Sequence, residues 1–137
     1  MPPLLRVDGL RTHYFGFGGS RIVKAVDGVS FTVEAGETFG IVGESGCGKT
    51  TTCHSIVRLL SPSARIVGGR IELDGENLLD LDTKAMRAVR GRRIASILQD
   101  PMASLDPLFS IGNQVAEPAY YHGCYAAGRC GGGSPSF

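Results

Sequence analysis

Residues 43–50 read Gly43-Glu44-Ser45-Gly46-Cys47-Gly48-Lys49-Thr50. These eight residues match the phosphate-binding pattern G-x-x-x-x-G-K-[ST] at every fixed position. The apolar run at residues 39–42 comes directly before them, and a helical pattern follows. A strand that enters a glycine-rich turn and continues into a helix is the setting that this motif requires. The stretch therefore predicts an α/β fold with a phosphate loop for a nucleoside triphosphate.

The residue types in this loop suit a polyanionic ligand that carries magnesium. Glycines let the backbone curl so that its N–H groups point inward, and the following helix adds free N–H groups and the positive end of its dipole. We expect Lys49 to reach the β- and γ-phosphates, Thr50 to bind the bridging Mg²⁺, and Thr51 to donate near the α-phosphate. The predicted contacts of ATP are Gly43, Glu44, Ser45, Gly46, Cys47, Gly48, Lys49, Thr50 and Thr51.

The four cysteines do not form a recognisable metal or disulfide pattern. Cys47 lies in the phosphate loop, where a helix N-terminus and a nearby lysine favour a thiolate, so it is either a reactive thiol or an inert small residue. We expect Cys53, in the helix that follows, to be a small core residue. His122, Cys124 and Cys130 have a spacing that matches no standard zinc pattern.

Composition indicates one globular domain without a general attraction to polyanions. The chain has 137 residues, of which 42% are hydrophobic and 20% charged, and its net charge is +1. We interpret the basic cluster at residues 87–93 as a solvated helix face and predict no nucleic-acid partner. Because no apolar run approaches the ~20 residues of a membrane span and no secretory signal is recognisable, we expect a cytoplasmic protein.

Alternation and turn residues predict a β-rich first half. Asp27-Gly28, Ala35-Gly36-Glu37 and Asp74-Gly75 are expected to be turns. The run at residues 39–42 suits a strand covered on both faces. The expected strands are residues 4–7, 22–26, 30–33, 39–42, 70–73 and 94–98.

Two helices are predicted, and the C-terminal end is not expected to fold. The first helix follows the phosphate loop and stops before Pro62. Its apolar residues at i, i+3, i+4 and i+7 are Cys53, Ile56, Val57 and Leu60. The second starts at Asp82 or Thr83 and runs to about Arg90. Residues 122–137 are glycine-rich without apolar period, so we predict an ordered part at residues 1–121 and a disordered tail.

Several stretches outside the loop carry a family resemblance. They are residues 24–31, 36–42, 69–78 and 86–95, together with Gln99-Asp100-Pro101-Met102 and the residues after it to Pro107. Together with the loop, they closely resemble the ATP-binding subunit of ABC transporters, within the oligopeptide, dipeptide and nickel importer group. The match covers about residues 4 to 118. It implies a P-loop NTPase core of the ABC ATPase type with an N-terminal antiparallel β part.

The resemblance also implies roles for residues outside the loop. Tyr14 is the best positional match to an aromatic residue that stacks on adenine, with Phe15 and Phe17 as rivals and a place in a hairpin core as the alternative. Gln99 matches a glutamine that helps to bind Mg²⁺ or the attacking water and that senses the membrane subunit. In such importers two ATP-binding subunits enclose ATP, and transmembrane permease subunits couple hydrolysis to transport at the cytoplasmic face of the inner membrane.

The resembled family has parts that these 137 residues do not contain. They are a helical subdomain with a Leu-Ser-Gly-Gly-Gln-type signature, a strand ending in Asp-Glu and a histidine switch. We expect a truncated or frameshifted product or an incomplete sequence, which binds ATP weakly without turnover and exposes apolar surface at residues 39–42 and 94–98. The alternatives are a non-catalytic nucleotide-binding remnant, a product without a stable fold, and a small P-loop kinase. A kinase would need an acceptor site and an arginine-rich lid, and neither Gln99-Asp100-Pro101 nor Asp74-Gly75 has a clear role there.

Overall fold

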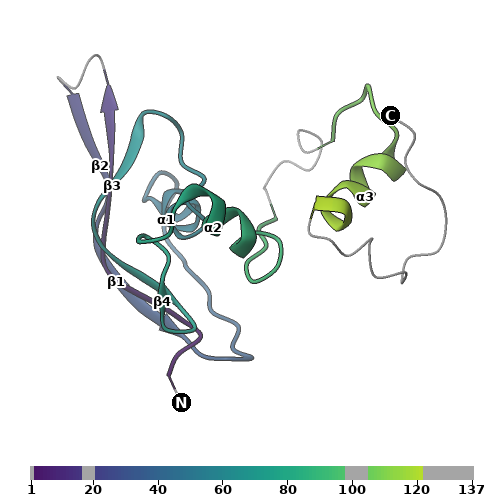
Figure 1. Ribbon diagram of the computed structural model, residues 1–137. Helices are drawn as coiled ribbons and strands as arrows, with labels where there is room; N and C mark the ends of the chain where they lie inside the picture. Colours follow the sequence, from purple (N-terminus) through teal and green to yellow (C-terminus); the bar gives the residue numbers. More distant parts are fainter. Residues whose placement is uncertain (1, 17–20, 98–104, 122–137) are drawn as a thin grey trace. The chain divides into compact units, whose positions relative to one another are not determined.

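The computed structural model describes residues 2–16, 21–97 and 105–121. The chain divides into two compact units, Met1–Asp82 and Thr83–Phe137. The first unit holds a sheet and helix α1, and the second holds α2 and α3 (Figure 1). The tail predicted at residues 122–137 lies outside the described residues.

The first unit is built on an antiparallel sheet with the strand order β2-β1-β3-β4. β1 lies in its centre, so most of its backbone groups are paired on both sides. The strands are β1 (Leu5–Gly16), β2 (Arg21–Val33), β3 (Ala64–Leu73) and β4 (Glu76–Asn77). The strands predicted at residues 4–7, 22–26, 30–33 and 70–73 are confirmed, but they are parts of longer strands.

The two Asp-Gly dipeptides that the sequence predicts as turns adopt different structures. Asp74 and Gly75 have φ angles of 50° and 81° and join Leu73 to Glu76, its partner in β4, so the predicted turn is confirmed as a two-residue hairpin. The turn predicted at Asp27-Gly28 is wrong, because the dipeptide lies inside β2. There the pairing with β1 shifts, and Gly28, at φ 85°, is the extra residue of a bulge.

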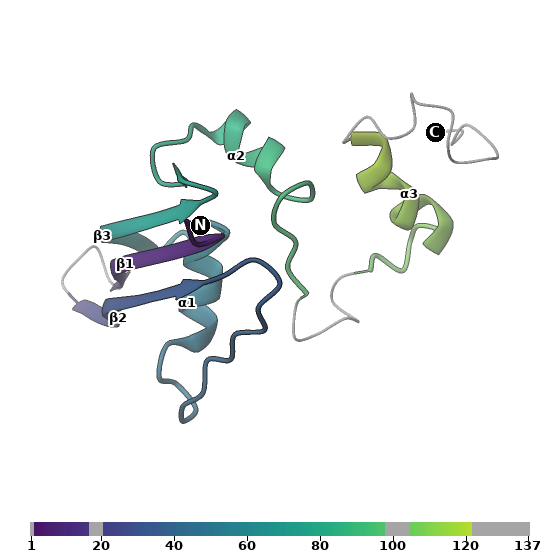
Figure 2. The same ribbon diagram turned by 90° about the horizontal axis from the view of Figure 1, so that it is seen from below.

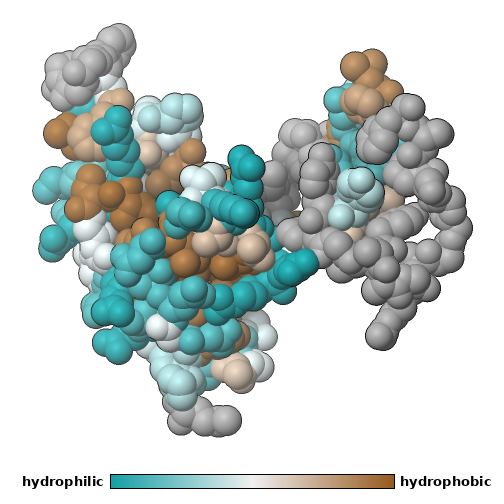
Figure 3. Space-filling model, viewed as in Figure 1, coloured by the Kyte–Doolittle hydropathy of each residue, from teal (hydrophilic) through white to brown (hydrophobic). Residues whose placement is uncertain are grey.

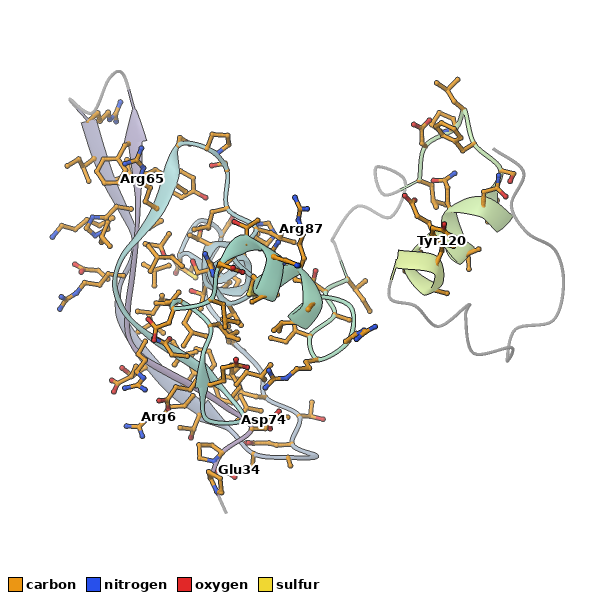
Figure 4. The ribbon with its side chains drawn as sticks, viewed as in Figure 1. Arg6, Glu34, Arg65, Asp74, Arg87 and Tyr120 are labelled. Carbon is orange, nitrogen blue, oxygen red and sulfur yellow. The ribbon has the colours of Figure 1, made fainter. Side chains whose placement is uncertain are left out.

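One face of the sheet is charged and the other carries the core. Arg6 pairs with Asp8 at 3.6 Å, and Arg70 pairs with Glu72 at 2.7 Å. Figure 4 shows Arg6 pointing from β1 away from α1. This division between a solvated and a covered face is usual for antiparallel sheets. The buried apolar residues of the first unit are Val7, Leu10, Val26, Val57, Ala64, Ile71, Leu73 and Leu78.

Helix α1 (Lys49–Ile56) lies against the sheet (Figure 2), and its buried residues carry hydroxyl groups. Its buried residues are Thr52 and Ser55, whereas Cys53 is exposed, so the core position predicted for Cys53 is wrong. The hydroxyls can be buried because each has a partner in the helix: Thr52 Oγ1 donates to Gly48 O at 3.0 Å and Ser55 Oγ to Thr51 O at 2.7 Å.

The first helix is also shorter than its apolar period predicts. It ends at Ile56, and Arg58 takes a left-handed conformation with φ 53°, well before Pro62. The Arg58 guanidinium stabilises this early end because Nη1 donates to Leu78 O at 2.9 Å and to Leu81 O at 2.6 Å. A contact with a segment twenty residues away therefore replaces the expected last helical turn.

The run at residues 39–42 is not a strand in the described structure, so that prediction is wrong. Val42 is 95% exposed, and the Phe39 ring stacks on Phe31 with a centroid distance of 4.9 Å while staying partly exposed. A strand needs a neighbouring strand for its backbone groups, and the described residues provide none for this run. The predicted exposure of apolar surface at this run is thus confirmed.

Apolar side chains also reach the surface at other places. Figure 3 shows them near the tip of the β1–β2 hairpin, where Ile22 and Val23 are about half exposed. The strand predicted at residues 94–98 is wrong for its described residues, since Ile94 makes only an isolated bridge with Arg90 and Ile97 is fully exposed. Leu98 lies outside the described residues.

The second unit contains two helices in its described part. α2 (Thr83–Val89) confirms the second predicted helix and buries Met86 and Val89. α3 (Ile111–Tyr121) was not expected from the sequence patterns, and Pro118 inside it is a residue that disfavours helices. Among the described residues, every helix is too short or too polar to cross a bilayer.

The approach of β3 to β1 predicts a stability difference between two glycines. A β-carbon on Gly69 (φ 97°) would lie 2.6 Å from the Leu10 Cα atom, whereas one on Gly75 (φ 81°) would meet no atom within 4 Å. Gly69→Ala should therefore lower the free energy of unfolding by roughly 2–5 kcal/mol, and Gly75→Ala by about 1–2 kcal/mol. Urea denaturation followed by circular dichroism measures both values. Equal losses would contradict the close approach.

Candidate functional site

The phosphate loop is a tight curl that ends at the first turn of α1. Gly46 and Gly48 have φ angles of 81° and 91°, which favour glycine. Gly48 is the N-cap residue, and no side chain caps the helix. A β-carbon on Gly48 would collide with the backbone carbonyl oxygen of Ala25 in β2. Glycine at this position therefore lets the start of α1 lie directly against the sheet.

Lys49 folds back over the loop that precedes it. Its Nζ atom donates to Gly43 O and to Glu44 O, each at 2.7 Å, and lies 3.4 Å from Cys47 Sγ. Both acceptors are neutral carbonyl oxygens, and among the described residues no carboxylate forms an ion pair with this ammonium group. Its positive charge is thus available to an anion at the mouth of the loop.

The backbone around Lys49 also has N–H donors without an acceptor among the described residues. Cys47 N donates to Glu44 O at 3.3 Å, but the N–H groups of Gly46, Gly48 and Lys49 have no acceptor within the described ranges. Unpaired N–H groups at a helix start bind phosphate because the donors and the helix dipole act on the same ligand. The residues present therefore fit a phosphate group, and the predicted contacts with ATP stay a prediction.

The threonines after the lysine lie in different surroundings. Thr50 is exposed, and its hydroxyl has no partner in the part of the chain that the structure describes, so it is open to a metal ligand role. Thr51 is half-buried, and its Oγ1 atom lies 3.4 Å from the Tyr14 hydroxyl. These positions suit the predicted roles of Thr50 at Mg²⁺ and of Thr51 at the α-phosphate side.

The structure separates two of the three aromatic residues considered for adenine. Tyr14 reaches α1 through its hydroxyl, whereas Phe15, the next residue of β1, contacts His13 and lies 5.9 Å from the guanidinium carbon of Arg65. Because successive strand residues point to opposite faces, Phe15 lies on the face away from α1, where Figure 4 labels Arg65 on β3. Tyr14 is therefore better placed, and Phe17 lies outside the described residues.

Gln99, the other predicted metal ligand, also lies outside the described residues, so its role stays a prediction. The structure adds two contacts that the motif does not indicate. One is the approach of Gly48 to Ala25, and the other is a buried hydroxyl pair between Thr12 and Ser55. The spacing of Thr51 and Ser55, four residues apart on a helix, is the sequence signal that indicates a shared hydroxyl face.

Comparison with known sequences points to one family. The profile of the family described as ABC transporter matches residues 26–127. A probable peptide ABC transporter ATP-binding protein of Sinorhizobium fredii (strain NBRC 101917 / NGR234) is 50% identical over 121 residues, 88% of this chain and 36% of the relative. The dipeptide transport ATP-binding protein DppD of Bacillus subtilis (strain 168) is 46% identical over 123 residues, 89% of this chain and 36% of that protein.

Comparison with solved structures establishes the fold. The dimeric structure of MJ0796, a bacterial ABC transporter cassette, superposes with a TM-score of 0.74 at 24% identity and covers 96% of this chain and 50% of that chain. The fold is therefore that of an ABC ATPase core with an antiparallel β part, as the sequence predicts. The chain spans 36% of the length of each of the two sequence relatives.

The contact between Gly48 and Ala25 predicts a loss of anion binding on substitution. Gly48→Ala should weaken the binding of magnesium-free inorganic triphosphate by about tenfold or more, because the β-carbon displaces the start of α1 from the sheet. Isothermal titration calorimetry measures the affinity. Gly36→Ala is the matched control, since Gly36 also has a positive φ of 76° but no atom within 4 Å of the added carbon. An unchanged affinity of the Gly48 variant would contradict the proposed phosphate cradle.

Proposed function

Because the chain belongs to the ABC transporter family, we propose that it binds ATP with Mg²⁺ at residues 43–51 and forms the nucleotide-binding part of a peptide importer. The observation that carries this proposal is the uncapped start of α1, where unpaired N–H groups and the Lys49 ammonium belong to the same short loop. A phosphate group complements both features by its charge and by its oxygen acceptors.

In this proposal each part of the loop has a separate task. The N–H groups of Gly46, Gly48 and Lys49 bind the phosphate oxygens. The Lys49 ammonium moves from Gly43 O and Glu44 O toward the β- and γ-phosphates, and it can do so because these exposed carbonyls then bind water. A triphosphate supplies a strongly charged acceptor, so this exchange of partners is favourable.

The metal and the base are proposed to lie near two consecutive threonines at the start of α1, the metal at Thr50 and the base beside Thr51. The exposed Thr50 hydroxyl is a ligand of the type that Mg²⁺ prefers, and Gln99 is proposed to add an amide oxygen. Bound Mg²⁺ neutralises charge on the phosphates. The Tyr14 hydroxyl lies 3.4 Å from Thr51 Oγ1, so the Tyr14 side chain is on the α1 side of the sheet and offers an aromatic surface for adenine.

We also propose the transport activity in which this nucleotide-binding part takes part. The relatives are named for peptide and dipeptide transport, and this favours peptides over nickel as the transported substrate. We propose that ATP hydrolysis drives this transport. Two ATP-binding subunits would hydrolyse ATP while bound to transmembrane permease subunits at the cytoplasmic face of the membrane. The MJ0796 cassette is described as dimeric, which supports the pairing.

Removal of the Lys49 charge tests the proposed site. Lys49→Ala should weaken magnesium-dependent ATP binding by about 10- to 150-fold, because it deletes charge-assisted hydrogen bonds to the phosphates. Retention on immobilised ATP and calorimetry measure this change, while circular dichroism checks the fold. Lys84→Ala, which removes an exposed lysine from α2, should leave the affinity unchanged. Equal affinity of wild type and the Lys49 variant would refute the site.

The position of Cys47 predicts that a thiol adduct competes with ATP. Its Sγ atom lies 3.4 Å from Lys49 Nζ, and a β-carbon built on Gly43 would lie 2.6 Å from it, so a bulky adduct would occupy the curl of the loop. Maleimide treatment of the Cys53→Ser variant should abolish ATP retention. The Cys47→Ser variant, which keeps the exposed Cys53, should retain ATP after the same treatment. Unchanged retention after complete modification of Cys47 would exclude this arrangement.

A further inference from the structure

A buried pair of hydroxyl groups joins the central strand to the phosphate-loop helix. Thr12 of β1 and Ser55 of α1 are both fully buried, and their Oγ atoms are 2.8 Å apart. The rest of the described contact between helix and sheet is short, because α1 has only eight residues. A directional polar contact of this kind fixes position more narrowly than apolar packing, which has no preferred angle.

The proton positions in this network follow from counting donors. Each hydroxyl has a single hydrogen. Ser55 Oγ donates its hydrogen to Thr51 O at 2.7 Å. In the 2.8 Å contact the Thr12 hydroxyl is therefore the donor and Ser55 Oγ the acceptor. The chain of hydrogen bonds therefore runs from Thr12 to Ser55 and from Ser55 to the Thr51 carbonyl. It links β1 to a residue at the phosphate end of α1.

The same two elements also hold the two ends of the proposed nucleotide site. β1 carries Tyr14, two residues after Thr12, so both side chains lie on the α1 face of the sheet. α1 begins at Lys49, which belongs to the phosphate loop. The 3.4 Å contact between Tyr14 and Thr51 is too long for a strong hydrogen bond. Gly48 places the start of α1 against β2, and among the described residues the Thr12–Ser55 contact is the strong hydrogen bond between side chains that joins α1 to β1, the strand that carries Tyr14.

We propose that the Thr12–Ser55 hydrogen bond is a positioning contact that sets the distance between Tyr14 and the phosphate loop. It thereby sets the affinity for the adenosine part of ATP separately from the affinity for the triphosphate. This inference rests on the proposed ATP site. A ligand that touches both elements senses their relative placement, whereas a triphosphate that touches only the loop does not.

The test compares two ligands on one variant. Thr12→Val keeps the shape of the side chain, removes the donor, and leaves Ser55 bonded to Thr51 O. In the full chain it should weaken Mg-ATP binding by about fivefold and leave the binding of magnesium triphosphate unchanged. Calorimetry measures both affinities, and circular dichroism monitors folding. Thr12→Ser, which restores the hydroxyl, should recover the ATP affinity, and Thr32→Val on an exposed position of β2 is the matched control.

The outcomes separate this inference from the function on which it rests. If the wild-type chain bound neither ligand, the proposed ATP site would be refuted, and this inference with it. If the wild type bound both and Thr12→Val weakened both equally, or neither, only the positioning role would be refuted. If Thr12→Val lost its fold, the Thr12→Ser variant would decide between the two possibilities. Because this variant keeps the hydroxyl, a loss of ATP affinity with unchanged triphosphate affinity would contradict the positioning role of the hydrogen bond. Wild-type affinities for both ligands would support that role.

Discussion

The close contact between Gly48 and the carbonyl oxygen of Ala25 fixes where α1 starts relative to β2. Because glycine has no β-carbon, α1 can start directly against β2, and any other residue at position 48 would collide with the Ala25 carbonyl oxygen. The helix consequently begins without a capping side chain, and its first N–H groups stay open. A feature that would weaken an ordinary helix is what makes this one suitable for phosphate.

The interface between α1 and the sheet is unusual because it buries hydroxyls instead of aliphatic groups. Thr52 and Ser55 each donate to a carbonyl oxygen one turn earlier, so neither is left unpaired. Burial of polar groups is tolerated only under this condition. The result is a helix that a directional contact at Ser55 joins to β1, while Cys53 remains exposed.

The exposed run at residues 39–42 has a simple physical explanation. Its sequence suits a strand that is covered on both faces, yet the described residues provide no neighbouring strand. This chain aligns with half of the MJ0796 cassette and spans 36% of its sequence relatives. A strand in the middle of a sheet depends on partners that are remote in sequence, and the exposed Val42 shows the consequence of their absence from the described residues.

Local chemistry in the sequence was sufficient to predict the glycine-rich curl before α1 and the Asp74-Gly75 hairpin, because the positive φ angles of their glycines are local properties of the backbone. The identical dipeptide at Asp27-Gly28 became a bulge, since pairing with β1 continues past it. Tertiary packing likewise exposed Cys53 and placed Tyr14, instead of Phe15, on the α1 side. Such outcomes depend on contacts between distant segments, which a local pattern does not encode.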